Sequence, residues 1–192
     1  MKRNFLIAVA ILGLCSSCDT DNEFFTDAQQ KTNNALQRSY ITTNYNYETY
    51  QWIIEGFEYH KSLPYHDNVM LYEKYVNTTL HEMGLNESYK MIDYEVLQKL
   101  LQTDEMIISE FDYSSDAKML MKQLLKEGSY DASVFQKLNP TEQSILNTMF
   151  ALSTDNKGDD KLGHDRTIAF AYGAQFSFTE AVLYAGAVAL HF

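Results

Sequence analysis

Proline is scarce in this chain, and that scarcity limits the possible folds more than any other feature. The sequence contains two prolines, Pro64 and Pro140, and eight glycines in 192 residues. Because proline removes a backbone donor and clashes with the preceding helical turn, its near absence allows long helices. Asn-Gly and Asp-Gly hairpin turns are also missing from the sequence, and apolar residues do not alternate over strand lengths. These features predict a single all-α domain, a bundle of about six to eight helices.

Cap residues and apolar spacing place the expected helices. A long first helix is expected between Thr26 and Pro64, and the weak propensity of residues 42–46 favours a break in its middle. Asn139, Pro140 and Glu142 supply a cap, a first-turn proline and an acid at the third position. Further helices are expected from Asp67 or Asn68 to Gly84, over 91–101 and 104–111, from Ser114 to Gly128, from Asn139 to about Leu152, and over 164–175 and 178–190.

Small residues spaced one helical turn apart occur in the last two predicted helices. Ala169 and Gly173 form one pair, and Ala181 and Ala185 form the other. Such spacing lets neighbouring backbones approach closely. Since the polar residues of 175–180 interrupt the apolar run, the pattern predicts a central helix hairpin inside the bundle rather than a membrane span.

The N-terminus has the organisation of a secretory signal peptide. Lys2 and Arg3 precede an apolar run from Phe5 to Leu14, and small residues follow it. Ten apolar residues are too few for a membrane-spanning helix, which needs about 20. The only two cysteines, Cys15 and Cys18, lie at the end of this run, so no disulfide can form in the body of the chain.

This segment resembles the lipobox signal of bacterial lipoproteins, in its looser Bacteroidetes-type form. Ser16 and Ser17 are the small residues before Cys18, and the resemblance implies that Cys18 is lipidated and becomes the first mature residue. It also implies an outer-membrane location, and the acidic stretch after Cys18 is either a surface-export signal or a solvated tether. The predicted organisation is therefore a signal peptide (1–17), a lipidated Cys18 with an acidic tether (18–25) and one all-α domain (26–192).

The net charge excludes one class of partner. Fifteen Lys and Arg against 26 Asp and Glu give −11, and removal of Lys2 and Arg3 with the leader gives 13 − 26 = −13. Such a chain repels phosphate backbones, so we expect no nucleic-acid partner.

Metal-based chemistry is one alternative. The pair His81-Glu82 lacks the second histidine of a zinc-protease helix, because position 85 is Leu85. A site built from His60, His66 and His81 remains open if the first two helices pair. The acidic residues between Asp155 and Asp165 offer oxygen ligands without the spacing of an EF-hand, and ion binding there stays open. No cofactor is expected.

Aromatic residues are concentrated between positions 40 and 75. Ten Tyr, Trp and Phe residues in this stretch cannot all lie on one buried stripe. Some are therefore expected at the surface, where aromatic planes suit protein or sugar binding. The candidate binding residues are Tyr50, Trp52, Tyr59 and Tyr65.

Together these patterns favour a lipid-anchored, non-catalytic binding domain for a protein or glycan partner at the cell envelope. One alternative is an envelope enzyme that uses carboxylates or a histidine-bound metal. The other is a structural envelope component that packs through its small-residue helices.

Overall fold

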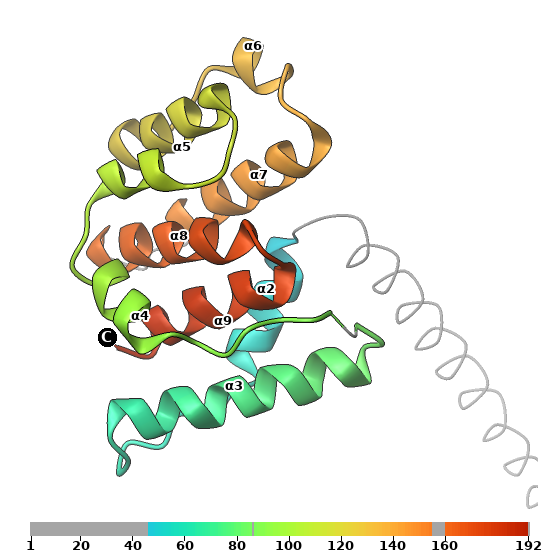
Figure 1. Cartoon of the computed structure of the whole chain (residues 1–192), viewed down its shortest axis with the longest axis vertical. Helices are drawn as coiled ribbons and strands as arrows, with labels where there is room; N and C mark the ends of the chain where they lie inside the picture. The colour runs from blue at the N-terminus through green and yellow to red at the C-terminus, as the bar shows by residue number, and fades with distance from the viewer. Residues whose placement is uncertain (1–45, 86, 155–159, 192) are drawn as a thin grey trace, which may run out of the picture. The chain divides into compact units, whose positions relative to one another are not determined.

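The computed structural model describes residues 46–85, 87–154 and 160–191, which belong to one compact unit (Figure 1). Within these ranges the chain forms eight α-helices and one 3-10 helix, with no strand, so the predicted all-α class is confirmed. The expected leader (1–17), the tether (18–25) and the start of the domain at residue 26 lie outside the described ranges. The elements are α2 (Tyr47–Glu55), α3 (Tyr65–Glu82), α4 (Tyr94–Leu100), η1 (Glu105–Glu110), α5 (Ser115–Glu127), α6 (Ala132–Phe135), α7 (Pro140–Thr154), α8 (Asp160–Ala174) and α9 (Phe178–Ala189).

The helices are stacked in an order that differs from their order in the chain. Figure 1 shows α3 along one side, α5 and α6 at the opposite end, and α8 and α9 between them. Helix α9 packs against both α3 and α8, α8 packs against α7, and α7 packs against α5. The C-terminal hairpin is therefore the centre of the fold.

Local cap signals predicted two helix starts correctly. The Asn139 side chain accepts the Glu142 backbone N–H at 2.9 Å, and α7 begins at Pro140. The Ser114 hydroxyl accepts the Ala117 N–H at 3.2 Å and caps α5. These contacts join residues three apart, which is why the sequence alone reveals them.

The start of α3 differs from the prediction because neither Asp67 nor Asn68 is its cap. Its fully buried carboxamide donates to the carbonyls of His60, Leu63 and Pro64 at 3.0–3.3 Å and accepts the His60 N–H at 2.9 Å. Asn68 thus stabilises the α2–α3 connection, and the helix begins three residues earlier, at Tyr65. Its end matches the prediction, since Gly84 adopts a φ of 81°.

Other boundaries changed modestly. Residues 56–64 are not helical, so the first predicted helix ends at Glu55 instead of continuing to Pro64. The predicted 104–111 piece is a 3-10 helix, and the short α6 was not predicted.

The predicted C-terminal helix hairpin is confirmed. A Cβ atom at Gly173 would lie 2.3 Å from the backbone oxygen of Glu180, so the two backbones meet there without a side chain between them. Helix α9 is buried from Phe178 to Val188, on every side. Among the described residues, no helix combines the length and the apolarity needed to cross a membrane.

Residues 177–180 read Ser-Phe-Thr-Glu, the sequence of a capping box, and half of that box is present at the start of α9. The Ser177 hydroxyl accepts the Glu180 N–H at 3.0 Å, as expected. The Glu180 carboxylate does not return to the Ser177 N–H, which donates to Gly173 instead. It accepts the N–H of Lys90 at 3.1 Å, ninety residues away in the chain.

Lys90 belongs to a non-helical segment, 87–93, that is hydrogen-bonded to α9. The Glu87 carboxylate accepts both the N–H and the hydroxyl of Thr179, at 3.0 and 2.9 Å. At the other end, the Asp93 N–H donates to the Tyr184 hydroxyl at 3.1 Å. Side chains therefore supply the hydrogen bonds that a neighbouring strand would give to an extended segment.

Gly186 provides a test of packing between α3 and α9. A Cβ there would lie 2.0 Å from the hydroxyl of Tyr72, which is fully buried and donates to the Val182 carbonyl at 3.0 Å. We expect Gly186→Ala to lower the free energy of unfolding by about 2 kcal/mol or more, because overpacking a fixed core side chain costs about 1–3 kcal/mol.

Gly56→Ala is the matched control. Its Cβ would meet the hydroxyl of Tyr75 at 2.2 Å, but Tyr75 is only half-buried and its ring can move outward. Chemical denaturation should therefore show a loss below about 1 kcal/mol for this variant. Equal losses at the two glycines would contradict the packing described for Tyr72.

Candidate functional site

Tyr50, one of the four predicted binding aromatics, is a core residue. Its side chain is 1% exposed, and its ring lies edge-on to Phe170 with the ring centres 6.1 Å apart. The prediction that Tyr50 displays a face at the surface is wrong, because α2 turns this side toward α8. A buried ring in this position contributes packing instead of ligand contact.

Tyr65 also has a structural role. Its half-buried hydroxyl donates to the Ala187 carbonyl of α9 at 2.7 Å, and its ring packs edge-on against His191. Burial, with a smaller effect of Tyr94, raises the pKa of this phenol. The hydroxyl therefore stays protonated as a donor to the core helix.

Trp52 and Tyr59 do lie at the surface, with 50% and 42% of their area exposed. Leu63, Met70 and Leu71 are exposed within the same stretch, so this stretch holds half of the ten large exposed hydrophobic side chains of the described ranges. We call these five residues the 52–71 surface. Scattered apolar residues are normal on a protein. The concentration of exposed apolar side chains in twenty residues of sequence makes this stretch the candidate interaction segment of the described ranges.

The surroundings of the 52–71 surface are acidic. Residues 46–82 contain six Asp and Glu and two Lys, which gives 2 − 6 = −4. Glu55 and Glu58 are both exposed between Trp52 and Tyr59. A partner with basic groups around an apolar centre would complement this arrangement.

The three histidines of the predicted metal site do not come together. His66 and His81 are fifteen residues apart on the single helix α3, about 22 Å at 1.5 Å per residue. Ligands of one ion lie within a few ångströms of each other, so these two cannot share a metal. Among the described residues no group of three His, Cys, Asp or Glu side chains is arranged to hold a metal ion. The proposed site at His60, His66 and His81 is therefore contradicted.

Part of the predicted acidic loop can be placed. Asp165 is buried on α8 and binds the Lys161 ammonium, while residues 155–159 lie outside the described ranges. His164 has Asp165 at 3.5 Å and Glu105 at 3.8 Å. Asp165 thus has a cationic partner within its own helix.

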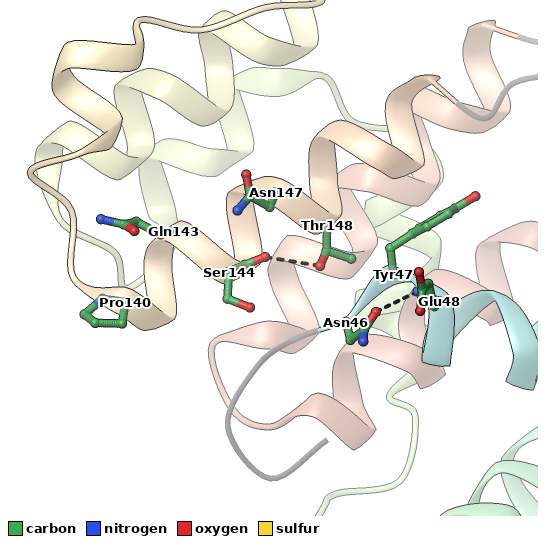
Figure 2. A pocket seen from close by; sticks show the side chains of 8 residues that line it. All are labelled: Asn46, Tyr47, Glu48, Pro140, Gln143, Ser144, Asn147 and Thr148. Carbon is green, nitrogen blue, oxygen red and sulfur yellow. Dashed lines mark hydrogen bonds between the residues drawn. The ribbon is translucent and has the colours of Figure 1, made fainter. Parts of the chain in front are cut away.

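A polar pocket of about 540 Å³ lies between the start of α2 and one side of α7 (Figure 2). Its lining comprises Asn46, Tyr47, Glu48, Pro140, Gln143, Ser144, Asn147 and Thr148. Two hydrogen bonds fix the local backbone: Asn46 accepts the Glu48 N–H at 2.8 Å, and Thr148 donates to the Ser144 carbonyl at 3.1 Å.

Several polar groups of this pocket already bond to neighbours. The Gln143 carboxamide donates to the Leu138 carbonyl at 2.9 Å, and the Asn147 oxygen accepts the Tyr130 hydroxyl at 3.1 Å. Glu48 is the only carboxylate among the eight lining residues. The sequence predicted where α7 begins, but it did not predict that the start of α2 would lie beside α7 and complete this pocket.

Comparison with protein-family models, curated proteins and solved structures finds no match to this chain. The functional conclusion therefore depends on the residues themselves.

Glu73 is a buried carboxylate on α3. Burial raises its pKa, although the Ile92 N–H bonds to the carboxylate and opposes the shift. Burial and the nearby Glu73 also raise the pKa of Tyr94, to about 12. Because its partner is the backbone of the 87–93 segment, Glu73 has a structural role in the fold.

This raised pKa gives a pH-dependent stability. A group with a raised folded-state pKa stabilises the fold fully below its unfolded pKa, here 4.5, and that contribution is lost as the pH rises through the folded value. Glu73→Gln keeps an acceptor for Ile92 without a buried charge. We expect the variant to be more stable than the natural protein at pH 7, with the difference shrinking toward pH 4.

Denaturation at several pH values measures this difference. Glu95→Gln, at an exposed position on α4, controls for the loss of one negative charge. A constant difference between pH 4 and pH 7, or a less stable Glu73→Gln protein at pH 7, would refute the assignment.

Proposed function

We propose that this protein is a lipid-anchored lipoprotein of the outer membrane whose helical domain binds a protein partner through the 52–71 surface. One observation supports the proposed lipid anchor. Both cysteines of the chain lie within four residues, directly after the ten-residue apolar run, and small residues precede Cys18. Attached acyl chains hold a protein on a membrane because each buried methylene contributes about 0.8 kcal/mol.

The choice of partner follows from the exposed side chains. Trp52 and Tyr59 are residue types that often dominate interface energetics, and Leu63, Met70 and Leu71 add aliphatic area. A sugar ring stacks on aromatic planes but gains little from isolated aliphatic side chains. The mixture therefore favours a protein over a glycan.

The buried carboxylates support a binding role over an enzymatic one. Glu73, Glu142 and Glu180 are buried, and each accepts a backbone N–H from a distant segment. These acids compensate for backbone groups that the helices leave unpaired. Their hydrogen bonds explain their burial without a substrate.

Replacement of the two cysteines tests the anchor. In a bacterial host that processes lipoproteins, we expect Cys18→Ala to abolish incorporation of an alkyne-labelled palmitate and to release the chain from the membrane fraction. Cys15→Ala, the matched control three residues earlier, should keep both the label and the location. Label retained by Cys18→Ala, or lost from Cys15→Ala, would disprove Cys18 as the attachment site.

Site-specific photo-crosslinking in cells tests the binding surface. A crosslinking residue at position 52 or 59 should give one discrete protein adduct. Position 119 on α5 is the control, because Met119 has a similar exposure of 47%. The same adduct at all three positions, or adducts that digest with glycosidases alone, would contradict a protein partner at this surface.

A further inference from the structure

A second pocket, of about 320 Å³, lies where α4 and η1 meet the C-terminal end of α8. We call it the α4–α8 pocket. It is smaller and more apolar than the pocket of Figure 2, and its lining includes no residue of the 52–71 surface. Its volume is near the lower end of the range for small-molecule sites in proteins, enough for a molecule with one or two rings.

Three aromatic rings form one side of this pocket. The ring of Tyr172 lies at a steep angle to both Phe111, at 5.8 Å and 65°, and Phe176, at 5.5 Å and 68°. Edge-to-face contacts of this kind hold aromatic rings in fixed orientations. Burial, with the nearby charges of Asp93 and Glu180, also raises the pKa of Tyr172, so its phenol is uncharged at neutral pH.

Phe176 is the unusual member of this group. More than half of its side chain, 54%, is exposed, although it sits in the turn between the two central helices. When a ligand covers an exposed phenylalanine beside an apolar pocket, the apolar ring is removed from water. This removal favours binding.

The turn that carries Phe176 is held in place. The Gln175 carboxamide donates to the Tyr172 carbonyl at 2.9 Å and accepts the Asp112 N–H at 2.6 Å. The Phe176 N–H donates to the Gly173 carbonyl at 3.0 Å. The rim of the pocket is therefore formed before any ligand arrives, which lowers the entropic cost of binding.

Three further lining residues of the pocket are aliphatic. Leu100 and Ile107 are core residues, and half-buried Val96 is the third. These side chains offer no hydrogen bonds. A sugar, with hydroxyls around its whole ring, would leave several of them unpaired against these side chains.

The charged residues at the mouth neutralise each other. The Lys99 ammonium and the Glu110 carboxylate form an ion pair of 2.9 Å, and both side chains are mostly exposed. No other lining residue is charged. A charged ligand would have to compete with this pair, whereas a neutral one with a single polar group could hydrogen-bond to it.

We propose that the α4–α8 pocket binds a small neutral molecule with a flat apolar ring, placed against Phe176 and the aliphatic side chains of Val96 and Leu100. The ring lies against the aromatic side chains, and a polar substituent points to the Lys99–Glu110 pair. This binding goes beyond the partner contact proposed above and does not require lipid attachment.

Titration by NMR tests the pocket on the full chain carrying Cys18→Ser, which removes the proposed anchor. The probe is benzyl alcohol, with a dissociation constant expected on the order of 1 mM for so small a ligand. Shift changes should be largest at the amides of Leu100, Phe111 and Phe176. Benzoate and benzylamine should bind no tighter, and glucose should not bind.

Two substitutions assign the binding to this pocket. Val96→Phe fills the space, and we expect it to weaken benzyl alcohol binding about tenfold or more. Phe176→Ala removes an exposed ring, so folding is preserved, and affinity should fall several-fold. Val134→Phe on α6, another half-buried valine, is the control and should bind as the natural sequence does.

Several results would overturn the proposal. These are unsaturable shifts, binding that neither Val96→Phe nor Phe176→Ala weakens, and tighter binding of benzoate or of glucose. A capped Gly-Phe-Gly peptide that binds more than tenfold tighter than benzyl alcohol would assign the pocket to a protein partner and refute the small-molecule ligand.

Discussion

The backbone contact between α8 and α9 is the constraint on which the rest of the structure depends. Gly173 lies so close to the Glu180 backbone that a methyl group would not fit between them. Because the two helices approach this closely, other elements can cover α9 on all its sides. Helices α3, α4 and α7 then pack around the hairpin. The Phe176 turn is part of the same contact, so the geometry of the α4–α8 pocket depends on it as well.

Tyrosine and glutamate side chains connect the outer elements to this centre. The hydroxyls of Tyr65 and Tyr72 donate to carbonyls of α9, and Tyr113 donates to the Ala171 carbonyl of α8 at 2.7 Å. Such residues bury a ring and also satisfy a backbone group. Among the described residues, most aromatic side chains therefore pack in the interior, and the few that are exposed are the better candidates for binding.

The sequence correctly predicted contacts between residues that are close in the chain. It did not predict contacts between residues that are distant in the chain. The caps at Ser114 and Asn139 act over three residues, and the apolar character of α9 indicates burial directly. Asn68 was misassigned, and the bond of Glu180 was not predicted, because their partners are the α2–α3 connection and Lys90, which no local pattern reveals. Tyr50 and Trp52 differ only in which side of α2 faces the core, and the sequence does not show this. The histidine site was excluded by helix length alone, a test that the sequence already allowed.

The long-range bonds of the 87–93 segment bear on the order of folding. Helices α8 and α9 meet through a three-residue turn, so their contact closes a very short loop and forms rapidly. The bonds from Lys90 to Glu180 and from Glu87 to Thr179 close loops of about ninety residues, and they need the hairpin as a template. Glu87 and Lys90 therefore acquire these bonds only after α9 has been synthesised, so this segment waits for about ninety further residues before its hydrogen bonds are complete.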